Sequence, residues 1–122
     1  MELGYRGTEL RRKLVAAVLR GEKIATASLR EEYEPHTSEQ LPQPGESFLL
    51  LGYDDERLGV VKTIELQVVR AADVDLQFAR DEGEGFETVA QWRSAHERFW
   101  SDREITDDTL IVCEWFTLIE RY

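Results

Sequence analysis

One stretch near the end of the chain constrains the fold more than any other. Residues 110–119 read Leu-Ile-Val-Cys-Glu-Trp-Phe-Thr-Leu-Ile, with apolar side chains in both alternating sets of positions. A strand with one face in water alternates apolar and polar residues instead, so this pattern predicts a central strand flanked by other elements. Cys113 lies inside the run and is the only cysteine, which excludes an internal disulfide and favours core packing for its thiol.

Three further segments have the composition of strands, namely residues 23–29, 47–53 and 60–69. The polar residues 54–59 between the last two predict a hairpin connection. Within the third segment, Ile64, Leu66 and Val68 alternate with polar residues, so we expect this apolar set to pack inward.

Two main helices and one short helix are also expected. Thr8 can cap a helix whose apolar residues share one face, and these are Leu10, Leu14, Ala17 and Val18. Residues 88–100 place a heavily aromatic set at helical spacings, and Asp73 can cap a short helix that reaches Ala79. Three prolines and many polar residues predict a long irregular loop over residues 30–47.

Length and composition indicate one domain that spans residues 1–122. The chain has 122 residues, of which 42% are hydrophobic, and no run of 18 apolar residues or secretory pattern is present. We therefore expect a cytoplasmic protein without a membrane partner. The formal charge of -10 disfavours indiscriminate nucleic-acid binding, although basic residues are concentrated in the first 23 positions.

A short corner after the first predicted helix carries a candidate site. Gly21 suits the left-handed residue that ends a helix, and Lys23 and Thr26 follow it. In a regular strand, residues three apart face opposite sides of the sheet. Both side chains can therefore act on one ligand only if the corner is turned or bulged. The alternative is that Lys23 lies beside the helix end and Thr26 fills an ordinary strand position.

A second candidate segment, residues 79–85, sets Glu82 and Glu84 among glycines. Glycines let the backbone bend and approach a partner closely, and the carboxylates can then orient a ligand amine or act as a base. The alternative is a helix terminus with solvated acids. The spacing of oxygen ligands does not match a calcium loop, so neither a metal nor any other cofactor is expected.

The remaining motifs of familiar enzymes are absent. The sequence has no G-x-S-x-G elbow, phosphate loop or dinucleotide fingerprint. His96 lies four residues from both Trp92 and Trp100, which favours packing along a helix, and His36 lies in the long loop without a partner at metal-ligand spacing.

Taken together, five features in order resemble the ASCH domain family. They are the first helix, the corner Gly21-x-Lys23-x-x-Thr26, the turn Leu41-Pro42-x-Pro44-Gly45, the loop Phe78-Ala79-x-x-Glu82-Gly83-Glu84-Gly85 and the helix with Trp92-Arg93-x-x-His96. The resemblance covers the chain from about residue 8 to its end. It implies an α+β, PUA-like fold, a small and mostly antiparallel β-barrel with covering helices, and a cleft for nucleoside-like molecules or short RNA.

Some members of the family hydrolyse N4-acetylated cytidine with a threonine, a lysine and a glutamate. By resemblance these are Thr26, Lys23 and Glu82. In such a set the threonine is the nucleophile, the lysine accepts its proton, and the carboxylate holds the lysine or the leaving amine. The resemblance also implies ligand contacts for Ser28, Glu84, Arg93 and His96. Phe86 departs from the family pattern, in which many relatives carry an acidic residue there.

Three functions are therefore consistent with the sequence. The first is an amidohydrolase that acts on N4-acylated cytidine-like nucleosides. The second is a non-catalytic RNA- or nucleotide-binding module with a regulatory role, and the third is a regulatory protein that merely shares the fold. The acidic charge favours a compact nucleoside over a long RNA. The sequence leaves the oligomeric state open.

Overall fold

A computed structural model describes all residues from 1 to 122. Its elements follow one another as α1 (Glu9–Leu19), β1 (Ala25–Leu29), β2 (Ser47–Leu51), β3 (Arg57–Arg70), α2 (Leu76–Asp81), α3 (Val89–Phe99) and β4 (Leu110–Arg121). Single turns of 3-10 helix occupy Arg30–Glu32 and Ala71–Asp73. None of the helices has the length and apolar character that a membrane crossing requires.

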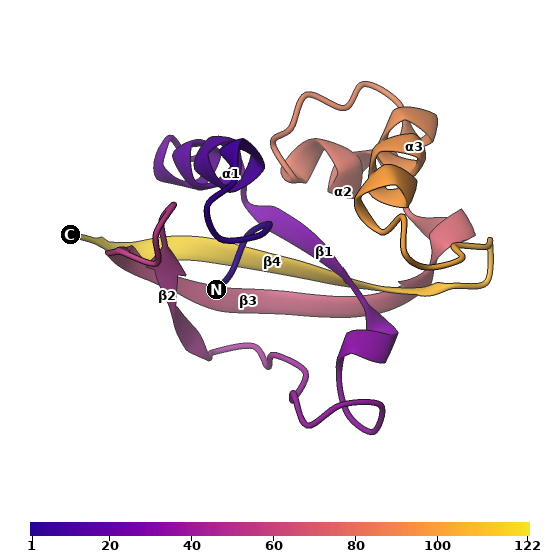
Figure 1. Ribbon diagram of the computed structural model, residues 1–122, viewed down its shortest axis with the longest axis horizontal. Coiled ribbons are helices and arrows are strands. Elements are labelled where there is room, and N and C mark those ends of the chain that lie inside the picture. The colour runs from indigo at the N-terminus through magenta and orange to yellow at the C-terminus, as the bar shows by residue number, and fades with distance from the viewer.

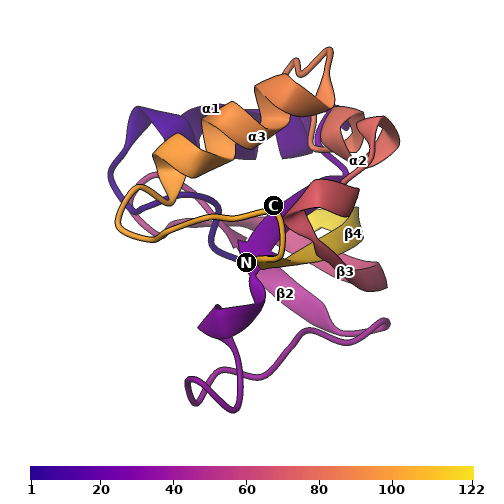
Figure 2. The ribbon, with the colours of Figure 1, turned by 90° about the vertical axis from the view of Figure 1, so that its right-hand side faces the viewer.

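The four strands form one curved antiparallel sheet, a half-barrel, in the order β1-β4-β3-β2. Figures 1 and 2 show the three helices grouped at one side of the molecule and the loop between β1 and β2 at the opposite side. The α+β, PUA-like fold class predicted from the sequence is confirmed. The prediction of a central last strand is also confirmed, because β4 pairs with both β1 and β3.

Two hydrophobic cores explain why β4 is apolar on both faces. The first core surrounds Trp92 of α3 and takes in side chains of α2 and β4. The second joins Val15 and Val18 of α1 to Phe116 of β4. Trp115 packs against the first core and its neighbour Phe116 belongs to the second. Consecutive strand residues point to opposite faces, so each face of β4 contributes to a different core.

The prediction that Ile64 and Val68 pack inward is wrong. Ile64 is 55% exposed and Val68 is 42% exposed, whereas Val61 and Thr63 are buried. Ile64 is the extra residue of a bulge, because the β3-β4 register shifts between Thr63 and Glu65. Val68 lies beyond the bulge, opposite Val112 near one end of β4, and the alternating pattern contained no sign of either feature.

The start of α1 was predicted correctly, but part of its inward face was not. The Thr8 hydroxyl accepts a hydrogen bond from the backbone N–H of Arg11 at 3.2 Å, as a helix cap should. Leu10 is exposed, and Arg11 is buried instead. The Arg11 guanidinium donates to the carbonyl of Leu3 and to the carboxylate of Asp55, which offsets the cost of burying its charge.

The short helix α2 begins two residues later than predicted. Its cap is Asp75, whose carboxylate accepts the backbone N–H of Phe78 at 2.8 Å. Asp73 instead belongs to the preceding 3-10 turn and pairs with Arg70 at the surface. Asp73 and Asp75 are both suitable helix caps by residue type, so the sequence alone does not show at which of them the helix begins.

Candidate functional site

The corner after α1 is irregular, as the shared role of Lys23 and Thr26 requires. Gly21 has a φ of +79°, and the backbone N–H of Lys23 donates back to the carbonyl of Ala17 at 3.1 Å. Lys23 thus precedes β1, which begins at Ala25. The strand alternation that would separate residues three apart does not apply, and Lys23 and Thr26 both line one cleft.

The Glu82–Gly85 loop packs directly against this corner. The N–H of Ile24 donates to the carbonyl of Asp81 at 2.9 Å. Gly83 has a φ of +67°, and a Cβ atom there would lie 2.3 Å from the carbonyl oxygen of Glu22 and 2.6 Å from the nitrogen of Lys23. Only glycine permits this contact, which brings the two candidate segments of the sequence together.

The Glu82 side chain makes more polar contacts than any other side chain of the site. One carboxylate oxygen accepts the backbone N–H of Ala27 at 3.1 Å and lies 3.8 Å from the Lys23 ammonium. The other accepts the indole N–H of Trp92 and lies 3.2 Å from Nε2 of His96. Burial alone would raise the pKa of the Glu82 carboxyl, but the His96 hydrogen bond and the Lys23 charge outweigh it and lower this pKa.

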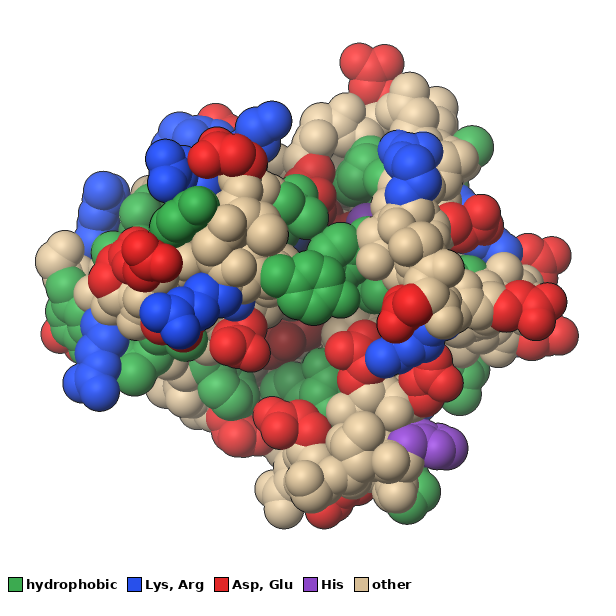
Figure 3. All heavy atoms as spheres, in the orientation of Figure 1, with side chains coloured by type: hydrophobic (Ala, Val, Ile, Leu, Met, Phe, Trp, Pro, Cys, Tyr) green, Lys and Arg blue, Asp and Glu red, His purple; other side chains and the backbone are tan.

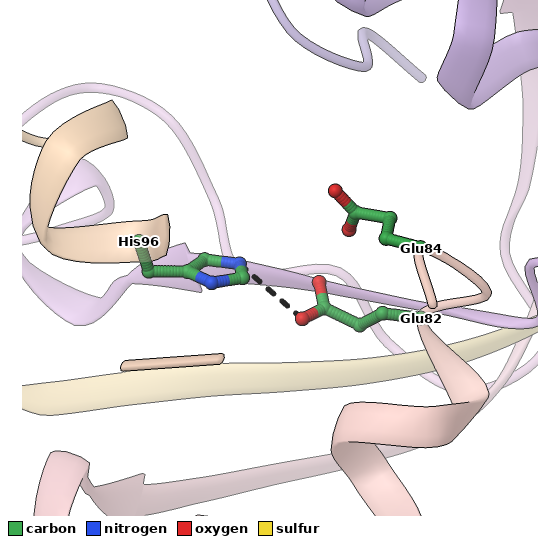
Figure 4. A group of neighbouring side chains, drawn as sticks. All are labelled: Glu82, Glu84 and His96. Carbon is green, nitrogen blue, oxygen red and sulfur yellow. Dashed lines mark ion pairs between the residues drawn. The ribbon is translucent and has the colours of Figure 1, made fainter. Parts of the chain in front are cut away.

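The surroundings of His96 favour its cationic form. Its Nδ1 lies 2.8 Å from the carbonyl oxygen of Trp92, and its Nε2 faces Glu82 (Figure 4). Both neighbours are acceptors, which favours a hydrogen on each ring nitrogen. Burial works against the charged ring, but the hydrogen bond and charge of Glu82 prevail and raise the pKa of His96 above its ordinary value. The ring also stacks on Trp92, with centroids 4.2 Å apart.

Lys23 connects both glutamates of the loop. Its Nζ donates to the backbone carbonyl of Glu82 at 3.2 Å and to the carboxylate of Glu84 at 3.4 Å. The Glu84 side chain is 22% exposed and reaches into the same space as Glu82 and His96 (Figure 4). Burial raises the pKa of the Glu84 carboxyl, although the Lys23 charge partly opposes that rise.

Thr26 lies on β1 directly opposite Glu114 of β4. Its hydroxyl makes no hydrogen bond within the protein and lines the cleft. Ser28, two residues further along the strand, also lines the cleft, and its hydroxyl lies 2.7 Å from that of Tyr33.

Two predicted site positions have other surroundings. Arg93 does not line the cleft, because its guanidinium pairs with Glu97 at 2.7 Å and with Asp107 at 3.1 Å on the outside of α3. Phe86 packs against the first hydrophobic core, and its ring centroid lies 5.8 Å from that of His96. An apolar side chain thus takes the place where many relatives carry an acid.

The cleft consists of two adjoining lobes. The inner lobe has a volume of about 390 Å³ and contains Lys23, Glu82, Glu84 and His96 in its lining. The outer lobe has a volume of about 690 Å³ and contains Glu114. Six residues line both lobes: Glu2, Thr26, Ala27, Ser28, Glu32 and Tyr33. Figure 3 shows a hollow near the middle of this face with acidic side chains around it.

Carboxylates dominate the lining of both lobes. They are Glu2, Glu32, Glu39, Glu46, Glu82, Glu84, Asp102 and Glu114. The only lysine and arginine in the lining are Lys23, which contacts Glu82 and Glu84, and Arg103, which pairs with Glu31 at 3.3 Å. Every cationic side chain of the lining therefore already has an acidic partner.

The donor set Glu82, Glu84 and His96 does not fit a metal ion. Its ligand atoms lie within 4.8 Å of one another. However, the Lys23 ammonium already supplies the positive charge beside both carboxylates, and each nitrogen of His96 faces an acceptor that favours a hydrogen on it. A metal needs a free imidazole nitrogen, so this group is an ion-pair network.

The sequence did not reveal two polar contacts of the site. The first is the Trp92 indole on Glu82, for which the Trp92-x-x-x-His96 spacing was an available signal, because residues four apart share a helix face. The second is Glu114, whose carboxylate accepts the Thr63 hydroxyl at 2.6 Å. That contact depends on the register of β3 against β4, which the bulge obscures.

Comparison with known proteins agrees with this fold. The model of the ASCH domain matches residues 3–120. The chain is similar to the crystal structure of an ASCH domain from Lactobacillus crispatus JV V101, with 29% identity and a TM-score of 0.80 over 89% of this chain and 72% of that one. It is also similar to a protein of Enterococcus faecalis V583, with 27% identity and a TM-score of 0.86 over 98% and 74%. No curated protein sequence matches it. The chain therefore belongs to the ASCH domain family.

Proposed function

We propose that this protein hydrolyses the amide of an N4-acylated cytidine-like nucleoside. The observation that carries the proposal is the arrangement of Lys23 and Thr26 in one cleft, with the lysine amine held by the Glu82–Gly85 loop. Thr26 has a hydroxyl without a partner in the protein, so it is free to attack a bound ligand.

In the proposed reaction Lys23 acts as the neutral amine, and it accepts the hydroxyl proton while Oγ1 of Thr26 bonds to the acyl carbon. The carbon–N4 bond then breaks, and the proton passes from Lys23 to the departing amine. Water hydrolyses the resulting ester, which releases the carboxylic acid and restores the threonine. Two acceptors, the Glu82 carbonyl and the Glu84 carboxylate, occupy two positions around Nζ, and the third position remains for the proton in transfer.

Glu82 serves this reaction by holding Lys23 in place. Its carboxylate accepts N–H groups from Ala27 and Trp92 and faces His96, so its own protonation is opposed by several donors. A carboxylate with a lowered pKa is a poor proton shuttle near neutral pH but a stable partner for an ammonium. Glu82 is a positioning residue in this account.

The charge of the cleft supports a nucleoside in preference to RNA. Phosphate groups are recognised through unpaired arginine or lysine side chains, and the lining of this cleft offers none. The inner lobe, of about 390 Å³, falls within the size range of small-molecule sites. A neutral nucleoside avoids the repulsion that the surrounding carboxylates exert on a phosphate.

A non-catalytic RNA- or nucleotide-binding module is the second candidate. It is favoured by one observation, which is that no hydrogen bond joins the Thr26 hydroxyl to Lys23 in this structure. In enzymes without bound substrate, the nucleophile and its base are often too far apart for a hydrogen bond, so its absence is also consistent with catalysis. The two functions make different predictions for the same variants.

The test is incubation of the protein with N4-acetylcytidine, other N-acylated nucleosides and short structured RNAs, with products identified by mass spectrometry. We expect cytidine and acetate from the first substrate and no binding of the RNAs at physiological salt. Binding of a short RNA without turnover of any acylated nucleoside, with Lys23→Ala weakening that binding in a folded protein, would replace the hydrolase with the binding module.

A further inference from the structure

Glu114 is a buried carboxylate that the proposed reaction does not use. It is only 6% exposed and makes no ion pair with any other residue. Its one hydrogen-bond partner is the buried hydroxyl of Thr63, which donates to Oε2 at 2.6 Å. The one cation that acts on this carboxyl is the N-terminal ammonium, which makes no ion pair with it, so much of the cost of its burial is not offset within the protein. Its presence on β4 therefore calls for a reason beyond packing.

The position of Glu114 connects it to the candidate nucleophile. Thr26 and Glu114 are directly opposite each other on the antiparallel strands β1 and β4. Side chains of such a pair lie on the same face, with Cβ atoms about 5 Å apart. Both residues line the outer lobe, and Thr26 also lines the inner lobe that contains Lys23. Glu114 thus adjoins the reacting end of the cleft.

We propose that Glu114 binds the exocyclic N–H and ring-nitrogen edge of the substrate's pyrimidine base, with Thr63 fixing the orientation of the carboxyl. The inference rests on the proposed function and names the part of the substrate that this residue recognises. It makes Glu114 a specificity-determining residue.

The chemistry of the carboxyl matches that edge. In cytosine, the exocyclic N4–H donates a hydrogen bond and the ring nitrogen N3 beside it accepts one. A carboxyl oxygen accepts from N4–H in either protonation state, and the acid form also donates to N3. Burial raises the pKa of the Glu114 carboxyl, although the Thr63 hydrogen bond opposes the rise, and this makes the acid form easier to reach than in water.

The same placement explains how the acyl group would reach Thr26. The acyl carbon of an N4-acylated cytosine is bonded directly to N4. A base held by Glu114 through N4–H therefore presents that carbon beside the residue opposite Glu114 in the sheet, which is Thr26. Uracil carries an acceptor oxygen in place of the N4 amine, so it leaves the carboxylate facing an acceptor.

The test measures binding of cytidine and uridine, which have no acyl group to lose, by titration calorimetry. We expect the wild-type protein to prefer cytidine roughly ten- to a hundredfold, as one two-point base contact provides. Glu114→Leu should abolish the preference, and Thr63→Val should reduce it. Glu114→Gln should also reduce it, because its amide can pair with uracil by accepting from N3–H and donating to O4.

Glu120→Gln is the matched control, since it removes the same charge from an exposed residue of the same strand that lines neither lobe. It should leave the preference unchanged. Equal binding of the two nucleosides to wild type, or a full preference in Glu114→Leu, would overturn the inference. If Glu114→Leu does not fold, loss of the preference in folded Thr63→Val decides for it and an unchanged preference decides against it. If the protein turns over no acylated nucleoside but still prefers cytidine in a way that depends on Glu114, the proposed hydrolysis is wrong and the inference about Glu114 stands.

Discussion

The ammonium of Lys23 lies 3.8 Å from the carboxylate of Glu82, and the two side chains are only 1% and 2% exposed. This buried ion pair joins the corner before β1 to the end of α2, which are far apart in the sequence. Breaking such a pair leaves one charge buried without its partner. The candidate site and the stability of the fold are therefore coupled through these residues.

Glu82→Ala should destabilise the protein by roughly 3–5 kcal/mol, the cost of leaving one member of a buried ion pair uncompensated. The truncation also removes the acceptor for the N–H groups of Ala27 and Trp92. Urea unfolding followed by tryptophan fluorescence measures the effect. Glu87→Ala, on an exposed residue of the same loop region, is the control and should change stability by less than about 0.5 kcal/mol. Equal stability of the two variants would contradict the coupling.

Gly83→Ala and Gly85→Ala separate backbone strain from steric contact. Both glycines have positive φ, +67° and +84°, so each substitution should cost about 1–2 kcal/mol from strain alone. Only at Gly83 would the new Cβ collide with the backbone of Glu22 and Lys23. Gly83→Ala should therefore be the more destabilising, and it should also displace the loop from Lys23. Thermal unfolding of the two variants checks the order, and a larger loss in Gly85→Ala would refute it.

Stability should fall as pH rises above about 6.5 because of His96. The folded state raises the pKa of His96 above its ordinary 6.5, so it binds the proton more tightly than the unfolded state does. The stabilisation is fully present below about pH 6.5 and is lost as pH rises through the folded pKa. His96→Gln, which cannot titrate, should flatten this part of the profile of unfolding free energy against pH. An unchanged slope in that variant would exclude His96 as its source.

The lowered pKa of Glu82 acts at the other end of the pH scale. Its contribution to stability is complete above its ordinary value of 4.5 and is lost as pH falls through the lower folded pKa. We therefore expect acid unfolding to require a lower pH in the wild type than in Glu82→Gln. Circular dichroism between about pH 5 and about pH 2 measures the two midpoints. Coincident midpoints would show that another carboxylate controls acid unfolding.

Local signals in the sequence predicted the elements, and long-range packing decided the rest. The apolar run in β4 and the glycine after α1 each determine structure through a few neighbouring residues, so both could be recognised. The bulge before Glu65 could not be recognised from the sequence, because it arises from the pairing of β3 with β4. Ile64, which was expected to pack inward, is exposed there.

At the candidate site, too, local sequence signals predicted some features and long-range packing determined the others. The glycines around Glu82 and Glu84 indicated a loop able to approach a partner, and the structure sets that loop against Lys23. The hydrogen bond of Trp92 with Glu82 requires α3 to pack beside the end of α2, and the pair of Thr63 and Glu114 requires the strand register. Neither follows from spacing within one element.

The rate of cytidine formation from N4-acetylcytidine by wild type, Thr26→Ser and Thr26→Ala tests the central claim most directly. Serine retains the hydroxyl and should retain measurable turnover, whereas alanine should lower kcat by at least about 10²-fold without lowering thermal stability. A threonine that only binds ligand would instead change KM. Wild-type turnover that persists unchanged in Thr26→Ala, or no cytidine from the wild-type protein at any substrate concentration, would contradict the account.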